Sequence, residues 1–224
     1  MKYKHIKNWQ RFLSYLIGIP LENKTSQWSE AISLRLKNNS LELSTENAVY
    51  SYGKHYYAFA EAFKQINIKE QKINDVLILG LGMGSIIEIL EEYFEKLSFT
   101  GIEKDSAIIE LYKKYVEPKS TFNISIYEDD AYEYVRDNQK KFDLINIDIF
   151  INDVIPDPFH DLAFLENLKK LLSKNGLVLF NRLDTKSSYV KYNKEYWDTK
   201  FLNVFPKSQS LKIKGNLILV GYNG

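Results

Sequence analysis

Four groups of residues in this sequence, each following an apolar run, are of types that could bind a ligand or move a proton. The first is a turn with Gly80, Gly82 and Gly84, directly after the apolar residues 76–79. Glycines let a backbone approach a ligand closely where side chains would block it. The N–H groups at the start of the helix expected from Ser85 would face that ligand. Such a turn also occurs as a plain strand-to-helix connection, so alone it is a weak indication of a ligand site.

An acidic residue, Glu103, ends the next apolar run, about 20 residues beyond the glycines. A carboxylate at that place can accept hydrogen bonds from both hydroxyls of a ribose. The same spacing occurs in nicotinamide-dependent dehydrogenases, so the first two groups indicate a nucleoside without choosing the cofactor. The alternative interpretation of Glu103 is a solvated charge at a strand end.

The other two groups are Asp130 with Ala131, and Asp148. Asp130 comes after a third strand, where it can cap a helix or hydrogen-bond an adenine amino group. Asp148 ends the apolar strand 142–147 at the crevice where doubly wound sheets bind ligands. A charge at the end of a buried strand has few structural reasons to exist, so we predict that Asp148 is catalytic.

Strands and helices must alternate to bring these groups to one edge of a sheet. Strands are expected at 76–79, 98–102, 124–127, 144–147 and 176–180, and helices from 85, 106, 130, 159 and 189. Residues 210–213 and 216–222 are expected to form an antiparallel hairpin at the sheet edge. This rhythm predicts an α/β fold with a doubly wound, mostly parallel, seven-stranded sheet in a domain spanning 71–224.

Residues 1–70 are predicted to form an N-terminal appendage to that domain. A short helix near Trp9, with one apolar face, is expected to end near Gly18 or Pro20. A β-hairpin at 31–43 and a connecting helix towards Phe63 should follow. The apolar helix face needs a partner, either the main domain or a second subunit in a homodimer, with a membrane surface as the alternative.

The composition excludes several classes of partner. Thirty basic and 29 acidic residues leave a formal charge of +1, which provides no overall attraction for nucleic acid or an anionic membrane. The absence of cysteine excludes disulfides, thiolate zinc sites and cysteine nucleophiles. Without an evident secretion signal or membrane span, we expect a cytoplasmic protein.

The order and spacing of these motifs resemble the class I methyltransferase fold, and within it the spermidine-synthase-like branch. The resemblance covers nearly the whole chain, including the run 142–148, Pro156 and the segment 175–181. It implies that the three glycines line the methionine end of S-adenosylmethionine, that Glu103 holds the ribose and that Asp130 meets the adenine. It also implies that Asp148 matches the carboxylate that deprotonates the attacking amine in aminopropyltransferases.

Two departures from the aminopropyltransferase pattern remove carboxylates. Met83 stands where that family has the aspartate that recognises the amine of decarboxylated S-adenosylmethionine. Ile151 replaces the second aspartate after the fourth strand, unless Asp153 takes its place. Tyr50 and Tyr52 fall where the family has substrate-contacting residues, so the acceptor pocket is expected to be aromatic and less acidic.

Three functions therefore remain open. The leading hypothesis is a methyltransferase using S-adenosylmethionine on an unidentified small acceptor, and the second is an aminopropyltransferase of polyamine biosynthesis using the decarboxylated cofactor. The third is a nucleoside-binding module without catalysis. Asp153, Asp157, His160 and Asp161 could bind a divalent ion, but a proline-rich loop and a helix start explain the same residues, so no metal is predicted.

Overall fold

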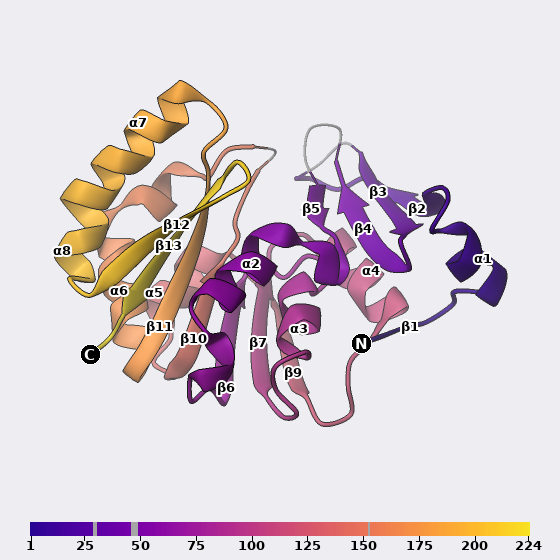
Figure 1. Cartoon of the computed structure of the whole chain (residues 1–224), viewed down its shortest axis with the longest axis horizontal. Helices are drawn as coiled ribbons and strands as arrows, with labels where there is room; N and C mark the ends of the chain where they lie inside the picture. The colour runs from indigo at the N-terminus through magenta and orange to yellow at the C-terminus, as the bar shows by residue number, and fades with distance from the viewer. Residues whose placement is uncertain (29–30, 46–48, 152) are drawn as a thin grey trace.

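A seven-stranded sheet forms the centre of the computed structural model, which describes residues 1–28, 31–45, 49–151 and 153–224 (Figure 1). Its strand order is β12-β13-β11-β10-β6-β7-β9. The strands are β6 (Asp75–Leu79), β7 (Ser98–Glu103), β9 (Asn123–Glu128), β10 (Phe142–Ile147), β11 (Leu172–Leu183), β12 (Ser208–Ile213) and β13 (Asn216–Tyr222). Five adjacent strands are parallel, and β12 and β13 join antiparallel at one edge. The predicted doubly wound sheet is confirmed.

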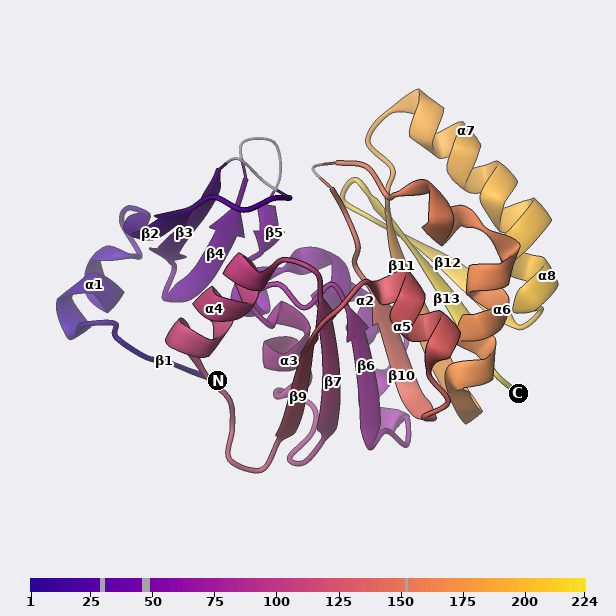
Figure 2. The same ribbon diagram turned by 180° about the vertical axis from the view of Figure 1, so that it is seen from behind.

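Helices cover both faces of this sheet. The elements are α2 (Tyr57–Gln65), α3 (Ser85–Leu90), α4 (Ser106–Tyr115), α5 (Ala131–Asp137), α6 (Leu162–Leu171), α7 (Ser187–Tyr196) and α8 (Leu202–Val204), with short helical turns at 53–55, 68–70, 157–160 and 197–201. Figure 1 shows α2 and α3 in front of the sheet, and Figure 2, from behind, shows α5 and α6 in front. The alternating apolar residues of the strands thus fill two cores, one on each face.

The N-terminal appendage is larger than the predicted hairpin. It is a four-stranded antiparallel sheet of β2 (Ile19–Lys24), β3 (Ile32–Lys37), β4 (Ser40–Ser44) and β5 (Val49–Ser51). Asn38 and Asn39, both at positive φ, make the expected turn between β3 and β4. The side chains that β3 and β4 bury belong to the same core as α2 and α3.

The first helix corrects a sequence prediction. The helix α1 (Asn8–Leu13) stops before Gly18, because residues from Ile19 onward extend into β2. Leu13 packs against the core, but Trp9 and Phe12 are 55% and 71% exposed, and Leu16, just beyond the helix, is 74% exposed. A two-stranded pairing of β1 (Lys2–Tyr3) with β8 (Val116–Glu117) attaches this end to the main domain. None of the helices in the described part of the chain is long and apolar enough to cross a membrane.

Candidate active site

A cavity of about 1040 Å³ lies at the carboxyl ends of the parallel strands, between the main sheet and the appendage. The predicted residues that line it are Gly80, Gly82, Glu103, Asp130, Ala131, Asp148, Tyr50, Tyr52 and Asp153. Gly84 is the exception, because it begins α3 and an added Cβ would meet the ring of Tyr112 at 2.7 Å. Carboxylates outnumber the basic lining residue Lys104, so the cavity suits a ligand that carries positive charge.

The glycine turn brings the backbone of β6 close to its neighbours. A Cβ at Gly80 would lie 2.2 Å from the carbonyl oxygen of Asp148, so only glycine fits between these strand ends. Ahead of the helix start at Ser85, two N–H groups of the turn are already used within the chain. The N–H of Gly82 donates to Glu103 at 3.0 Å, and the N–H of Met83 donates to the hydroxyl of Ser51.

Glu103 sits at the end of β7 with its carboxylate fixed by two backbone donors. Its Oε2 accepts from Gly82 and its Oε1 accepts from the N–H of Asp105 at 3.1 Å. Burial raises the pKa of Glu103, and these two N–H groups oppose the rise. The carboxylate is therefore held rigidly at the cavity wall, and its remaining lone pairs can accept the two hydroxyls of a ribose.

Asp130 both caps a helix and pairs with a lysine. Its Oδ1 accepts from the N–H of Tyr132 at 2.8 Å, and its Oδ2 lies 2.8 Å from the ammonium of Lys104. Burial alone would raise the pKa of Asp130, but Lys104 and the helix N–H together hold it below its ordinary value. One oxygen of Asp130 thus caps the helix, and the other is bound to Lys104. An adenine amino group that bound Asp130 would compete with Lys104 for that second oxygen.

Asp148 follows β10 and contacts two polar side chains that sequence analysis did not single out. The amide nitrogen of Asn181, on β11, donates to Asp148 Oδ1 at 2.9 Å. The hydroxyl of Tyr56, from the start of α2, also hydrogen-bonds this carboxylate. Burial raises the pKa of Asp148 to about 6, against the opposing effect of both donors. Burial and the charge of Asp148 raise the pKa of Tyr56, so the phenol stays protonated and donates.

The polar residues at these strand ends form a row across the sheet. Because the strand order is β11-β10-β6-β7-β9, Asn181 and Asp148 come first, the glycine turn is in the middle, and Glu103 and Asp130 follow. A signal for Asn181 was present in the sequence, since it is a polar residue directly after the apolar run 177–180. Tyr56 had no such signal, because the packing of α2 on the sheet brings it to Asp148.

Residues expected on the acceptor side also line the cavity. Tyr50 and Tyr52 do so from the appendage, and Ile151, 41% exposed, does so from the loop after β10. Asp153 lies 3.2 Å from the ammonium of Lys186 and accepts from the hydroxyl of Tyr189. Asp153, which could replace the aspartate missing at Ile151, is thus already paired with Lys186. Its neighbour Asn152 lies outside the described residues.

Met83 points away from the cavity. Its side chain is 2% exposed and belongs to the core shared by α3 and the appendage, and it does not line the cavity. The side chain of Met83, at the position expected to carry an aspartate in aminopropyltransferases, therefore packs in the core.

A buried arginine holds the segment 155–160, which follows the loop after β10. Arg182, 1% exposed, donates to Asn193 at 2.8 Å and to His160 Nδ1 at 3.3 Å. Since arginine only donates, His160 accepts at Nδ1 and donates from Nε2 to the carbonyl of Ile155. Among the described residues, no three His, Asp or Glu side chains gather as metal ligands would.

The sheet order, the glycine turn and the strand-end carboxylates define the class I methyltransferase fold, and solved structures share it. A probable spermidine synthase from Corynebacterium glutamicum superposes with a TM-score of 0.73 at 19% identity, covering 93% of this chain and 81% of that one. Human methyltransferase-like protein 13 in complex with SAH gives a TM-score of 0.59 at 18% identity, covering 73% of this chain and 81% of that one. At these identities the likeness concerns the fold.

Sequence comparison places the family. Residues 61–210 match the profile of the spermine/spermidine synthase domain, so the chain belongs to that family. A polyamine aminopropyltransferase from Vibrio vulnificus is 26% identical over 151 residues, which are 65% of this chain and 49% of the relative. The chain thus spans about half the length of that curated relative.

Proposed function

We propose that this chain transfers a methyl group from S-adenosylmethionine to a nitrogen atom of a small amine. The proposal is carried by the row of polar residues at five strand ends. Glu103 and Asp130 lie towards one end of this row, and Asp148 lies towards the other. In this arrangement the glycine turn on β6 lies between the two ends, where the reacting sulfur and nitrogen would meet. Alignment of the reacting atoms is the main contribution that such a cavity makes to the rate.

Each side chain has a distinct task in this proposal. Glu103 would hold the ribose and Asp130 the adenine side of the nucleoside, while the sulfonium of the bound donor supplies the electrophilic carbon. Asp148 would accept a proton from the ammonium form of the acceptor, because its raised pKa lies closer to neutrality than that of an ordinary aspartate. Tyr56 and Asn181 would orient that carboxylate towards the acceptor.

Methyl transfer is favoured over aminopropyl transfer by the charges near the reacting end. A decarboxylated donor brings an unpaired ammonium to the cavity, whereas S-adenosylmethionine brings its own carboxylate beside its amine. Met83 is buried in the core, and Asp153 is paired with Lys186. The ammonium of a decarboxylated donor would therefore lack these two partners, and losing a hydrogen bond to a charged group costs roughly 1.5–3 kcal/mol.

Aminopropyl transfer is the second candidate, and a specific finding supports it. The family match and the Vibrio vulnificus relative both point to polyamine chemistry, and Asp153 does line the cavity. A polyamine could take Asp153 from Lys186, because both members of that exposed pair are accessible to solvent.

Mass spectrometry of reaction products separates the two candidates. Purified protein would be incubated with an amine panel and with either S-adenosylmethionine or its decarboxylated form. We expect the addition of a methyl group with the first donor, and no product from the Asp148→Asn variant. Addition of an aminopropyl group to putrescine, with release of methylthioadenosine, would replace methyl transfer by the second candidate.

A further inference from the structure

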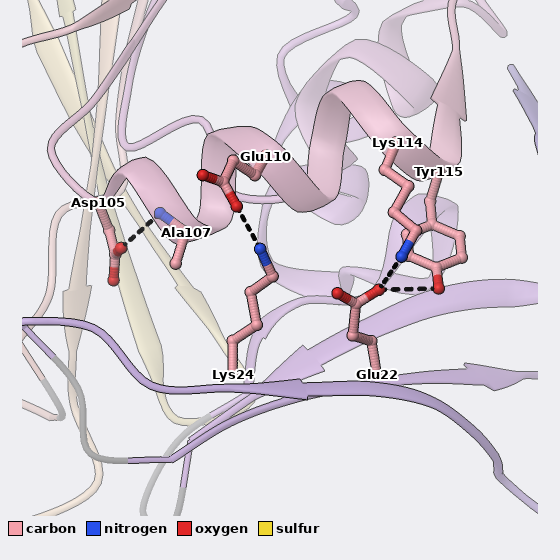
Figure 3. Close-up of polar contacts among 7 residues, drawn as sticks. All are labelled: Glu22, Lys24, Asp105, Ala107, Glu110, Lys114 and Tyr115. Carbon is pink, nitrogen blue, oxygen red and sulfur yellow. Dashed lines mark hydrogen bonds and ion pairs between the residues drawn. The ribbon is translucent and has the colours of Figure 1, made fainter.

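The strand β2 runs along α4 and is fastened to it by ion pairs. Figure 3 shows Glu22 accepting from the ammonium of Lys114 at 2.6 Å and from the hydroxyl of Tyr115 at 3.0 Å, while Lys24 pairs with Glu110. These contacts fix the direction in which the chain leaves β2. It leaves towards the first residue of α4, beside the nucleoside end of the cavity.

Two further contacts attach the next residues to that end. The hydroxyl of Ser26 donates to Asp105 Oδ2 at 2.5 Å, and the same carboxylate caps α4 by accepting from Ala107 through Oδ1. The N–H of Trp28 then donates back to Ser26 at 3.1 Å. Asp105 is 4% exposed and follows Glu103 by two residues, so this anchor is part of the nucleoside wall.

The indole of Trp28 consequently lies over the strand ends of β7 and β9. The ammonium of Lys104 is 3.9 Å from the centre of the ring, and the same ammonium pairs with Asp130. Trp28, Lys104 and Asp130 all line the cavity. Trp28 is nevertheless 37% exposed, so part of this aromatic residue is open to solvent in the wall of the cavity.

We propose that Trp28 is a nucleoside-binding residue, supplied by the appendage, whose ring stacks on the adenine of the donor. The inference rests on the proposed function for the identity of the ligand. Lys104 contacts both the ring and Asp130, so the ring lies beside the carboxylate that is proposed to meet the adenine. Stacking on an aromatic side chain does not depend on what the donor transfers.

Tryptophan fluorescence tests this role with 5′-methylthioadenosine, a nucleoside that lacks both the amino-acid and the aminopropyl end. The chain has 3 tryptophans, Trp9, Trp28 and Trp197. We expect the nucleoside to quench the fluorescence of the native protein and of the Trp9→Phe control. In Trp28→Phe the quenching should disappear while the affinity is largely kept, and in Trp28→Ala the affinity measured by calorimetry should fall about tenfold.

The outcomes separate this inference from the proposed function. Unchanged quenching in Trp28→Phe, or unchanged affinity in Trp28→Ala, would overturn the role of Trp28 while leaving the donor site in place. Failure of the native protein to bind the nucleoside at all would overturn both. A nucleoside that quenches Trp28 in a protein without methyl transfer would leave the role of Trp28 standing and refute the reaction.

Discussion

At the scale of single residues, the account depends on two carboxylates with different environments. Glu103 is fixed by two backbone N–H groups, whereas Asp148 is held by the side chains of Tyr56 and Asn181. In the proposed function, Glu103 binds the nucleoside and Asp148 acts on the acceptor. The first should act through binding and the second through proton transfer. Each therefore has its own measurable consequence.

Replacing Glu103 by alanine should weaken nucleoside binding by roughly 1.5–3 kcal/mol, the range for losing hydrogen bonds to a charged group. Calorimetric titration with S-adenosylmethionine measures this loss. Glu128→Ala provides a matched control, because Glu128 also ends a strand but is exposed and does not line the cavity. Equal affinity of the Glu103 variant and the control would limit Glu103 to a structural role, through its hydrogen bonds to Gly82 and Asp105.

The pH dependence of the reaction should follow Asp148. As a base, it works in its deprotonated form, so kcat/KM should fall as the pH drops below about 6. Asp148→Asn should lose activity by roughly 100-fold or more at every pH. A pH profile that stays flat from 5 to 8 in the native enzyme would remove Asp148 from the proton-transfer step.

The same carboxylate should lower the stability of the fold at neutral pH. Its folded pKa of about 6 is above the ordinary 3.8, so its contribution to stability is complete below about pH 4 and is lost as the pH rises through 6. Asp148→Asn should therefore raise the free energy of unfolding at pH 7.5 by roughly 2–3 kcal/mol. Denaturant titrations at pH 7.5 and pH 4 check this, since the gain should vanish at the lower pH.

At the scale of elements, the glycine turn illustrates what the sequence could predict. Gly80 and Gly82 were expected to admit a ligand, and both do line the cavity. The structure adds that Gly80 is also required by the neighbouring strand end, where the carbonyl of Asp148 leaves no room for a side chain. Sequence spacing along one chain could not show this contact, because it joins residues of two different strands.

Gly80→Ala should accordingly destabilise the fold itself. Its φ of +87° disfavours a side chain, and the added methyl would overlap Asp148. We expect the free energy of unfolding to fall by roughly 1–3 kcal/mol, as for overpacked sites. Gly18→Ala is the control, because a Cβ there meets only Arg35, at 3.8 Å. Comparable stability of the two variants would show that the ends of β6 and β10 can move apart without a loss of folding free energy.

The missed strand β2 has a similar physical explanation. Pro20 within an apolar run argued against a strand and favoured the end of a helix, yet β2 is an edge strand of the small sheet. Proline is tolerated at an edge because no neighbour needs its missing N–H. By contrast, the strands of the main sheet were predictable, since each is an apolar run followed by a glycine, an acidic residue or a helix start.

At the scale of the whole molecule, the appendage and the sheet build the cavity together. The polar ends of the strands were visible in the sequence, but the tyrosines, Trp28 and the contact of Tyr56 with Asp148 depend on how the first 57 residues fold across the sheet. Local patterns carry no information about such long-range contacts. The cofactor half of the site was therefore predicted more fully than the acceptor half.

The choice between the two donors tests the central claim most directly. Calorimetric titrations of the native protein with S-adenosylmethionine, its decarboxylated form and NAD should be run side by side. Losing one suitable carboxylate costs roughly 1.5–3 kcal/mol, so we expect the decarboxylated form to bind about tenfold or more weakly than S-adenosylmethionine, and NAD to bind weakest. Tighter binding of decarboxylated S-adenosylmethionine would contradict the account and identify the chain as an aminopropyltransferase that uses another carboxylate, with Asp153 the first to replace by asparagine.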